Sequence, residues 1–360
     1  MLTTDRIFMK IIVGMSGGVD SAVAALLLKE AGHEVIGMTL RTWPEKDGAE
    51  SRCCEIDDAR ETAWKLHIPY HAPNCIAAFD EKVKRPFFQS YIDGLTPNPC
   101  IECNRFLKWE RMLYYAAVMD ADAIATGHYA SVVRLPNGRW TVQQAASAEK
   151  DQTYMLYGLT QEQLARTLMP LGKLSKAEVR KIAADAGLSV AHKQDSQEIC
   201  FVTEGSYTDY IEADGTLHAP DEGNFVSEDG RILGRHKGII HYTVGQRRGL
   251  GIAFGVPMYV KRINAETNEI VLCEETSLYS NVIRCKDLNF LSISDITDGE
   301  TVRARVKIRY HHEGENASIT RDSDETVCIT FDKPVRAATP GQSAVFYDID
   351  NCVIGGGKIT

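Results

Sequence analysis

The stretch "GMSGGVDS", Gly14–Ser21, decides how the first half of the chain is interpreted. It follows the apolar run "RIFMKIIVG" (residues 6–14), which predicts a buried strand, and it leads into "DSAVAALLLKEAG" (residues 20–32), which predicts a helix. Gly17 and Gly18 permit positive backbone angles that turn successive N–H groups toward an anion, and the dipole of the following helix adds to that field. The stretch therefore predicts a phosphate-binding loop.

The polar side chains of this loop suit the same purpose. Ser16 and Ser21 can donate hydroxyl hydrogen bonds to phosphate, while Asp20 can cap the helix or help to hold magnesium. The loop lacks the lysine of the G-x-x-x-x-G-K-[ST] pattern, which disfavours a simple γ-phosphate hydrolase. The alternative, a glycine-rich turn that serves only strand-to-helix geometry, would suit an isolated pair of glycines better than eight residues in this context.

The first two hundred residues continue to alternate between strand and helix, which predicts an α/β domain with a parallel sheet covered on both faces. Gly32 is expected to close the first helix, and Ser175 with Glu178 forms a capping box before another. The further strands are expected at residues 33–40 and 121–127, and the further helices at 55–67, 77–93 and 105–120.

The residue pattern changes from about residue 207, where short β-rich runs and glycines begin. From about residue 282, runs of alternating apolar and polar residues follow. We therefore predict three domains. Residues 1–206 form the nucleotide-binding catalytic domain, residues 207–281 a small β-rich domain, and residues 282–360 an antiparallel barrel or sandwich, of which we favour the barrel.

The net charge of the 360-residue chain is −9, which argues against a surface coated with phosphate-binding lysines. Residues 231–263 nevertheless contain basic residues and no acidic one. In "VRARVKIRYHH" (residues 302–312), apolar and cationic residues alternate with a period of two, so this run predicts a strand with one cationic face. A solvated outer face is the alternative for one such strand; two basic stretches favour a polyanion partner.

No apolar run approaches the roughly 18 residues that cross a bilayer, and the first residues lack the features of a secretory signal. We expect a cytoplasmic protein, with translation starting at Met1 or Met9, and no membrane partner. Ten cysteines in that compartment are not expected to form structural disulfides, so some can be reactive.

Two segments hold the cysteines of interest. In "TPNPCIECN" (residues 96–104) the C-x-x-C spacing suits half of a metal site, a redox pair, or a nucleophile with an incidental neighbour. In "DSQEICF" (residues 195–201) Cys200 stands among polar residues. The other cysteines, taken singly, are predicted to be buried small hydrophobes: Cys53, Cys54, Cys75, Cys273, Cys285, Cys328 and Cys352.

The loop resembles the PP-loop (S-G-G-x-D-S) of the ATP pyrophosphatase superfamily, which implies cleavage of ATP between its α and β phosphates and an adenylated substrate oxygen. That superfamily includes enzymes of GMP, NAD and arginine synthesis as well as tRNA thiolases. The resemblance implies ATP, with Mg²⁺, as cofactor, and ATP-binding roles for Gly14, Met15, Ser16, Gly17, Gly18, Val19, Asp20 and Ser21.

Four motifs in order, "GMSGGVDS", "NPCIECN", "ATGHYA" and "DSQEICF", resemble the tRNA-specific 2-thiouridylase family, and the resemblance continues through "RYHH" and "TPGQSAVFY" over nearly the whole chain. It implies that ATP adenylates the 2-oxygen of the wobble uridine of tRNA and that a cysteine persulfide then attacks, which releases AMP. A second cysteine resolves the sulfur linkage. It also implies two partners, the anticodon arm of tRNA and an upstream persulfide donor protein.

Matched to the motifs, Cys103 falls on the family's catalytic cysteine and Cys200 on its persulfide carrier, and the two would end as a transient disulfide. Many members have Asp where this chain has Cys100, and a thiol is a weaker candidate for acid/base work there. The other implied contacts are Leu40 and Gly127 with ATP; Asn98, Pro99 and Cys100 with the target base; and His128, Lys150, Asp151, Gln152, His311, His312 and Gln342 with tRNA.

Three alternatives stay open. An iron–sulfur thiolase of the same superfamily could use Cys100, Cys103 and Cys200 as thiolates, and it would be brown. A redox or zinc module would hold stoichiometric zinc, although no second C-x-x-C is present. Nucleotide or amino-acid ligation would need no cysteine. The resemblance favours an enzyme with no tightly bound metal or cluster.

Overall fold

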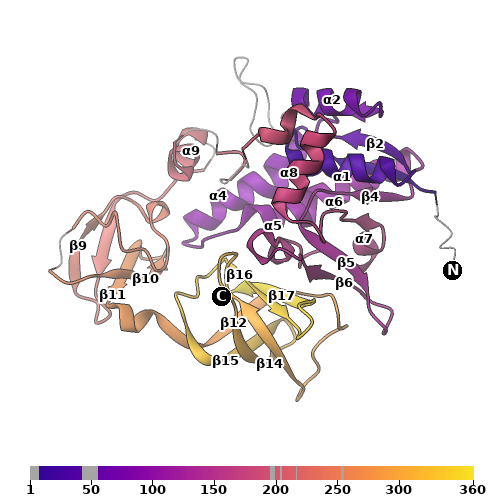
Figure 1. The fold of residues 1–360 in the computed structure, drawn as a ribbon. Helices are drawn as coiled ribbons and strands as arrows, with labels where there is room; N and C mark the ends of the chain where they lie inside the picture. Colours follow the sequence, from indigo (N-terminus) through magenta and orange to yellow (C-terminus); the bar gives the residue numbers. More distant parts are fainter. Residues whose placement is uncertain (1–7, 43–55, 195–198, 203–204, 216, 253–254) are drawn as a thin grey trace. The chain divides into compact units, whose positions relative to one another are not determined.

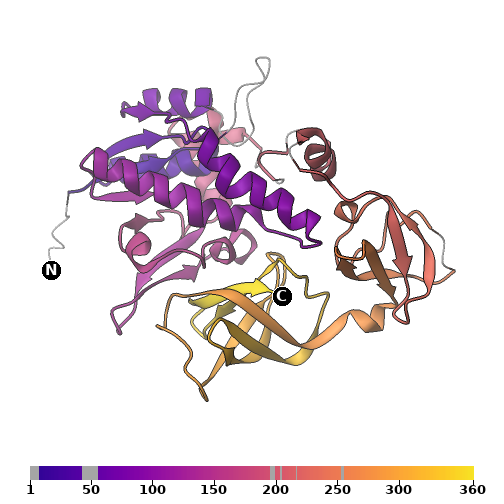
Figure 2. The ribbon, with the colours of Figure 1, turned by 180° about the vertical axis from the view of Figure 1, so that it is seen from behind.

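The computed structural model describes residues 8–42, 56–194, 199–202, 205–215, 217–252 and 255–360 (Figures 1 and 2). The predicted structural cysteines Cys53 and Cys54 lie outside these residues. The chain forms two compact units. The first consists of the described parts of Met1–Val83, Cys100–Thr203 and Asn351–Val353, and the second of the described parts of Lys84–Pro99, Glu204–Asp350 and Ile354–Thr360.

The first unit is built on a five-stranded parallel sheet with the strand order β3-β2-β1-β4-β7. In the central strand, Ile12 pairs with Ile36 on one side and Ile124 on the other, and all three are buried. A strand buried on both faces is apolar throughout, as the sequence predicted. The strands are β1 (Lys10–Gly14), β2 (Glu34–Met38), β3 (Tyr70–His71), β4 (Ala123–Ala125) and β7 (Thr167–Leu168).

Helices cover both faces of this sheet (Figures 1 and 2). Because side chains alternate along a strand, Ile11 and Val13 of β1 share one apolar core with α1, α2 and α8, while α6 packs on β1 and β4. The unit's helices are α1 (Val19–Glu30), α2 (Ile56–Lys65), α3 (Ile76–Phe79), α6 (Trp109–Val118), α7 (Gln161–Ala165) and α8 (Lys176–Asp185), with α5 (Pro99–Cys103) at its border.

Local signals set the ends of these helices. Gly32 has φ +92° and donates its N–H to the Lys29 carbonyl (2.9 Å), so it closes α1 as predicted. The predicted capping box is confirmed, because Ser175 N–H donates to Glu178 (2.7 Å) and Glu178 N–H to the Ser175 hydroxyl (3.3 Å). The predicted helices at 77–93 and 105–120 are helical, but each contains a π-helical turn, Asp80–Lys84 and Asn104–Lys108.

The first unit also contains a strand pair that the alternation did not predict, β5 (Ala130–Arg134) with β6 (Trp140–Gln144). The second unit begins with α4 (Arg85–Ile92) and α9 (Tyr207–Asp214). Helix α9 corrects the prediction that the chain is β-rich from residue 207: Ser206 caps it with a capping box. A sheet of order β10-β11-β8-β9 follows, formed by β8 (Gly223–Val226), β9 (Ile232–His236), β10 (Tyr259–Asn264) and β11 (Glu269–Cys273).

A closed six-stranded barrel ends the chain, and its strand order is β12-β15-β14-β13-β16-β17. The fold class is therefore confirmed: a parallel-sheet α/β domain, a small β domain and an antiparallel barrel. The borders between the three predicted domains stay a prediction. The strands are β12 (Tyr279–Phe290), β13 (Thr301–Lys307), β14 (Glu315–Ser323), β15 (Thr326–Arg336), β16 (Ser343–Tyr347) and β17 (Val353–Ile359).

Strand β13 has the alternation that the sequence predicted. Ala304 and Val306 are buried in the barrel core, whereas Arg303 is exposed on the opposite face. The cationic face is nevertheless partly neutralised, because Arg303 makes a bidentate ion pair with Asp332 (2.9 and 2.7 Å). None of the helices in the ranges given above is long and apolar enough to cross a membrane.

Candidate active site

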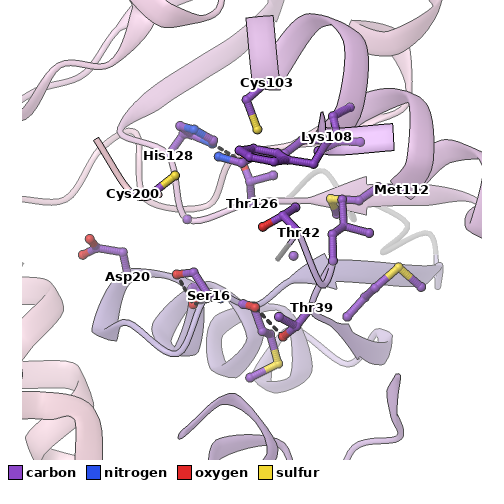
Figure 3. A pocket seen from close by; sticks show the side chains of 18 of the residues that line it. Ser16, Asp20, Thr39, Thr42, Cys103, Lys108, Met112, Thr126, His128 and Cys200 are labelled. Atoms are coloured by element: carbon purple, nitrogen blue, oxygen red, sulfur yellow. Dashed lines mark hydrogen bonds between the residues drawn. The ribbon is translucent and has the colours of Figure 1, made fainter. Parts of the chain in front are cut away.

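A cavity of about 230 Å³ opens where β1 and β4 end, in the first unit (Figure 3). The strand order reverses at this point, since β2 lies on one side of β1 and β4 on the other, and open α/β sheets bind ligands at such switch points. The lining residues are Gly14, Met15, Ser16, Asp20, Ser21, Met38, Thr39, Leu40, Thr42, Phe79, Cys103, Leu107, Lys108, Met112, Thr126, Gly127, His128, Gln152 and Cys200.

The phosphate loop is held by its own hydrogen bonds. Gly17 has φ +72°, which only glycine adopts readily, and Thr39 donates its hydroxyl to the Met15 carbonyl (2.6 Å). Ser21 accepts from the Ser16 N–H (3.1 Å) and donates to the Gly18 carbonyl (3.0 Å). The hydroxyl hydrogen of Ser21, which we predicted for phosphate, is therefore used within the loop, and the loop is preorganised.

We predicted that Asp20 either caps α1 or helps to hold magnesium. The first of these predictions is wrong, because the N-cap residue of α1 is Gly18 and Asp20 lies within the first turn. Its carboxylate accepts from the Tyr129 hydroxyl (2.7 Å) and from the Lys176 ammonium (2.8 Å to each oxygen). Lys176 supplies a positive charge beside a loop that has no lysine of its own. The sequence analysis missed it, because only the folded chain brings residue 176 to residue 20.

A second lysine reaches the loop from the same part of the chain. Lys193 donates to the Gly17 carbonyl (3.3 Å) and forms an ion pair with Asp58. The sequence could not predict this contact either, because Lys193 lies 176 residues from Gly17 and only the folded chain brings them together.

Gly127, a predicted ATP contact, lines the cavity and also packs against the start of α1. A Cβ atom at this position would lie 2.7 Å from the Asp20 carbonyl carbon and 2.7 Å from the Ser21 nitrogen. These are backbone atoms that cannot rotate away. The glycine is therefore required for close packing whatever ligand enters the cavity.

Cys103 and Cys200 line the same cavity although they are far apart in the sequence. Cys103 ends α5 and is 9% exposed, whereas Cys200 is more exposed. Phe201, next to Cys200, packs edge-to-face on Phe79 (5.4 Å between ring centroids). Both cysteines are thiols here, so the transient disulfide stays a prediction. Residues 195–198 of the motif "DSQEICF" lie outside the described residues.

His128 lies beside the two thiols, across the cavity from Ser16 and Thr39 (Figure 3). Its Nδ1 lies 2.8 Å from the Thr126 hydroxyl. Burial, with a smaller contribution from the Lys108 charge, lowers the pKa of His128 to about 3. The imidazole is therefore neutral at physiological pH.

Several predicted contacts have other surroundings. Asn98, Pro99 and Cys100, all within the described residues, are not part of the lining. Asp151 is 4% exposed, and its carboxylate accepts hydrogen bonds from the Thr153 hydroxyl (2.7 Å) and the Ala145 N–H (3.1 Å). This carboxylate therefore has a structural role, whatever contact its segment makes with RNA.

The remaining predictions divide between the two units. Leu40 and Gln152 line the cavity, and the Gln152 side chain accepts from the Tyr129 N–H (2.9 Å). Lys150 lies two residues before Gln152 in the sequence. The three predicted RNA contacts of the barrel, in the second unit, are His311, His312 and Gln342.

The cysteines predicted to be structural differ from those of the cavity. Burial raises the pKa of Cys75, Cys273 and Cys285, which keeps these thiols protonated and unreactive. Cys352 is also buried, and Cys328 is partly exposed.

A preorganised glycine loop at the switch point of a parallel sheet, with two thiols in the same cavity, defines an α/β protein with a site for an anionic ligand beside two cysteines. Three family models match consecutive parts of the chain. They are described as tRNA methyl transferase HUP domain (residues 9–204), tRNA methyl transferase PRC-barrel domain (residues 215–274) and Aminomethyltransferase beta-barrel domain (residues 280–359).

Curated relatives match the chain over nearly its whole length. It is 51% identical to the tRNA-specific 2-thiouridylase MnmA of Lachnoclostridium phytofermentans and 50% identical to that of Acetivibrio thermocellus, over 97% of this chain and 99% of each relative. The MnmA of Clostridium kluyveri is 47% identical with the same coverage. The chain belongs to the tRNA-specific 2-thiouridylase family. The word "methyl" in the three family descriptions disagrees with these names; the near full-length identity favours thiolation.

Proposed function

We propose that this enzyme replaces the 2-oxygen of the wobble uridine of tRNA with sulfur and converts ATP to AMP and pyrophosphate. One observation carries the proposal: the cavity lined by the phosphate loop also contains Cys103 and Cys200. Nucleotide activation acts on the oxygen and sulfur transfer on the carbon of one carbonyl group, so both kinds of group are needed in one cavity.

The phosphate loop performs the first step. A uracil carbonyl is a poor electrophile with a poor leaving group, and transfer of AMP to its oxygen corrects both faults. Gly17 and the N-terminus of α1 favour the developing negative charge on pyrophosphate. The Asp20 carboxylate lines the cavity and would hold Mg²⁺ in place of the Lys176 ammonium, from which both of its oxygens accept in this structure; Mg²⁺ keeps several waters and binds one or two carboxylates plus phosphates. When bound, Mg²⁺ neutralises phosphate charge.

Cys200 suits the role of sulfur carrier because it is the more exposed of the two thiols and can be reached by a donor protein. The donor passes one sulfur atom to Cys200, giving a persulfide. Its terminal sulfur attacks C2 of the adenylated uridine; a C–S bond forms, the C–O bond breaks, and AMP leaves with the oxygen. Cys200 is then joined to the base through two sulfur atoms.

Cys103 completes the reaction. Its thiolate attacks the sulfur of Cys200, so that a Cys103–Cys200 disulfide forms and the electron pair of the broken S–S bond remains on the sulfur attached to C2. The products are 2-thiouridine and an oxidised enzyme, which a cellular dithiol must reduce before the next turnover. Cys103 is nearly buried, which protects its thiolate from other oxidants.

The test combines purified enzyme, MgATP, a persulfide source and unmodified tRNA, followed by nucleoside analysis. We expect one 2-thiouridine and one AMP per tRNA, and no product from a matched tRNA with cytidine at the wobble position. AMP without the thionucleoside would contradict the proposal. Stoichiometric iron or zinc in active enzyme would favour the cluster or zinc alternatives, and ligation of another substrate by a Cys200→Ser variant would favour a ligase.

A further inference from the structure

The loop before α5 is fastened to the barrel through Thr96. The Thr96 N–H donates to the Pro340 carbonyl (2.9 Å), and the Gln342 side-chain amide donates to the Thr96 carbonyl (2.9 Å). All these residues belong to the second unit. Both backbone groups of Thr96 are thus satisfied by the turn between β15 and β16.

The turn is closely fitted to this loop. Gly341 has φ +89°, and a Cβ atom there would lie 2.9 Å from both the Leu95 Cβ and the Thr96 nitrogen. Gln342 is itself fixed, because its N–H donates to Thr339 (3.1 Å) and its carbonyl accepts from the Ile359 N–H of β17 (2.8 Å). The anchor is therefore part of the closed barrel and does not depend on a mobile side chain alone.

The fastened loop leads directly to a thiol that lines the cavity. Thr96 lies three residues before Pro99, the first residue of α5, and Cys103 is the last residue of that helix. The residue after it, Asn104, is 2% exposed and donates to the Met155 carbonyl (3.0 Å) in the first unit. The segment before α5 is thus held within the second unit, and the residue that follows Cys103 is held within the first.

We propose that Gln342 is a positioning residue for Cys103. Its amide holds the Thr96 carbonyl in the segment that leads into α5, so the segment that carries the Cys103 thiol is ordered before any RNA binds. The consequence for turnover rests on the proposed function; the effect on the thiol does not. One N–H and the carbonyl of the Gln342 amide are not used by Thr96, so an additional RNA contact is compatible with this role.

The experiment measures the rate at which iodoacetamide alkylates Cys103 in the full-length, tRNA-free enzyme, by mass spectrometry of the Cys103 peptide. Loss of one such hydrogen bond should change that rate about three- to tenfold in Gln342→Ala. Gly341→Ala, which disturbs the same contact without removing the amide, should change it in the same direction. In turnover, kcat should fall by a similar factor, with the Kd for tRNA within about twofold.

Two comparison variants separate positioning from RNA binding. Gln89→Ala removes a glutamine amide of the same segment that donates to exposed Asp93 (2.8 Å) and should leave alkylation unchanged. His311→Ala removes an exposed predicted RNA contact and should weaken tRNA binding without changing alkylation. The proposal is overturned if folded Gln342→Ala, with an unshifted melting temperature, alkylates at the wild-type rate and loses only tRNA affinity. Failure of the wild-type enzyme to make 2-thiouridine would instead overturn the proposed function and leave the alkylation result standing.

Discussion

The two sides of the cavity are built in different ways. The phosphate side is one continuous loop, Gly14–Ser21, whose backbone angles and internal hydrogen bonds are set by its own sequence. The sulfur side joins Cys103, at the end of a five-residue helix, to Cys200, in an irregular segment from another part of the chain. A loop that points backbone N–H groups at an anion can be set by local sequence alone, whereas a site that combines Cys103 with Cys200 needs the fold to bring two distant segments together.

The largest expected effect separates these two sides. Cys103→Ser and Cys200→Ser should each lower 2-thiouridine formation by at least about 10³-fold, because each removes a sulfur that must form a bond. Both variants should still catalyse tRNA-dependent exchange of pyrophosphate into ATP, because the phosphate loop is intact. Nucleoside analysis and exchange assays on the same preparations measure the two steps.

Cys100→Ser is the matched control, since Cys100 lies in the same helix as Cys103 but outside the lining. We expect only partial loss of thiolation. A dead Cys100 variant beside a working Cys103 variant would show that the wrong thiol has been assigned, and loss of exchange in all three would show that the two sides are not separable.

The phosphate side should break at Gly127. Because the added methyl group of Gly127→Ala meets the backbone of Asp20 and Ser21 at 2.7 Å, the start of α1 must move, and we expect a loss of about 3 kcal/mol in unfolding free energy and weaker ATP binding. Gly18→Ala is the control: its Cβ would meet only the Ser16 hydroxyl at 3.5 Å, so stability should change by less than about 1 kcal/mol. Urea unfolding measures both; equal stability losses would refute the packing role of Gly127.

The same contrast explains what the sequence could predict. Short-range rules predicted the order of strands and helices, the closure of α1 by Gly32, the glycine loop and the buried face of β13. The structure confirms these four features. The pairing of Cys103 with Cys200 came from resemblance, since no short-range rule joins segments that distant. Lys176 was missed for this reason, because its ion pair with Asp20 spans 156 residues.

The surroundings of particular side chains could not be predicted either. The Ser21 hydroxyl, predicted for phosphate, donates to the Gly18 carbonyl, and Asp151, in a segment predicted to bind RNA, is buried; the phosphate and RNA contacts themselves stay predictions. In both cases the residue type indicated a polar role but not its partner, because a buried polar group takes whichever partner the fold brings near.

His128, which lies beside the sulfur side, predicts a pH dependence of stability. Its folded-state pKa of about 3 lies below its ordinary value of 6.5, so between these values the unfolded chain binds a proton that the folded chain does not. Stability should therefore fall as pH drops below 6.5, approaching a loss of about 3 kcal/mol at pH 4.5. Urea unfolding of wild type and His128→Asn from pH 7.5 to 4.5 isolates the contribution of His128. If the unfolding free energies of the two proteins fell in parallel with pH, the prediction would be contradicted.

The smallest expected effect concerns the lysine that links the phosphate loop to α8. The side chains of Lys176 and Asp20 are 14% and 32% exposed, so their ion pair is screened less than a surface pair but is not fully desolvated. A double-mutant cycle with Lys176→Met and Asp20→Asn should give a coupling energy of about 1 kcal/mol in unfolding free energy. Lys181 with Asp185, an ion pair at 79% and 69% exposure, is the matched control and should couple by less than about 0.5 kcal/mol. Equal coupling in the two pairs would mean that Lys176 is an ordinary surface lysine, and that the phosphate side is as local as its sequence suggests.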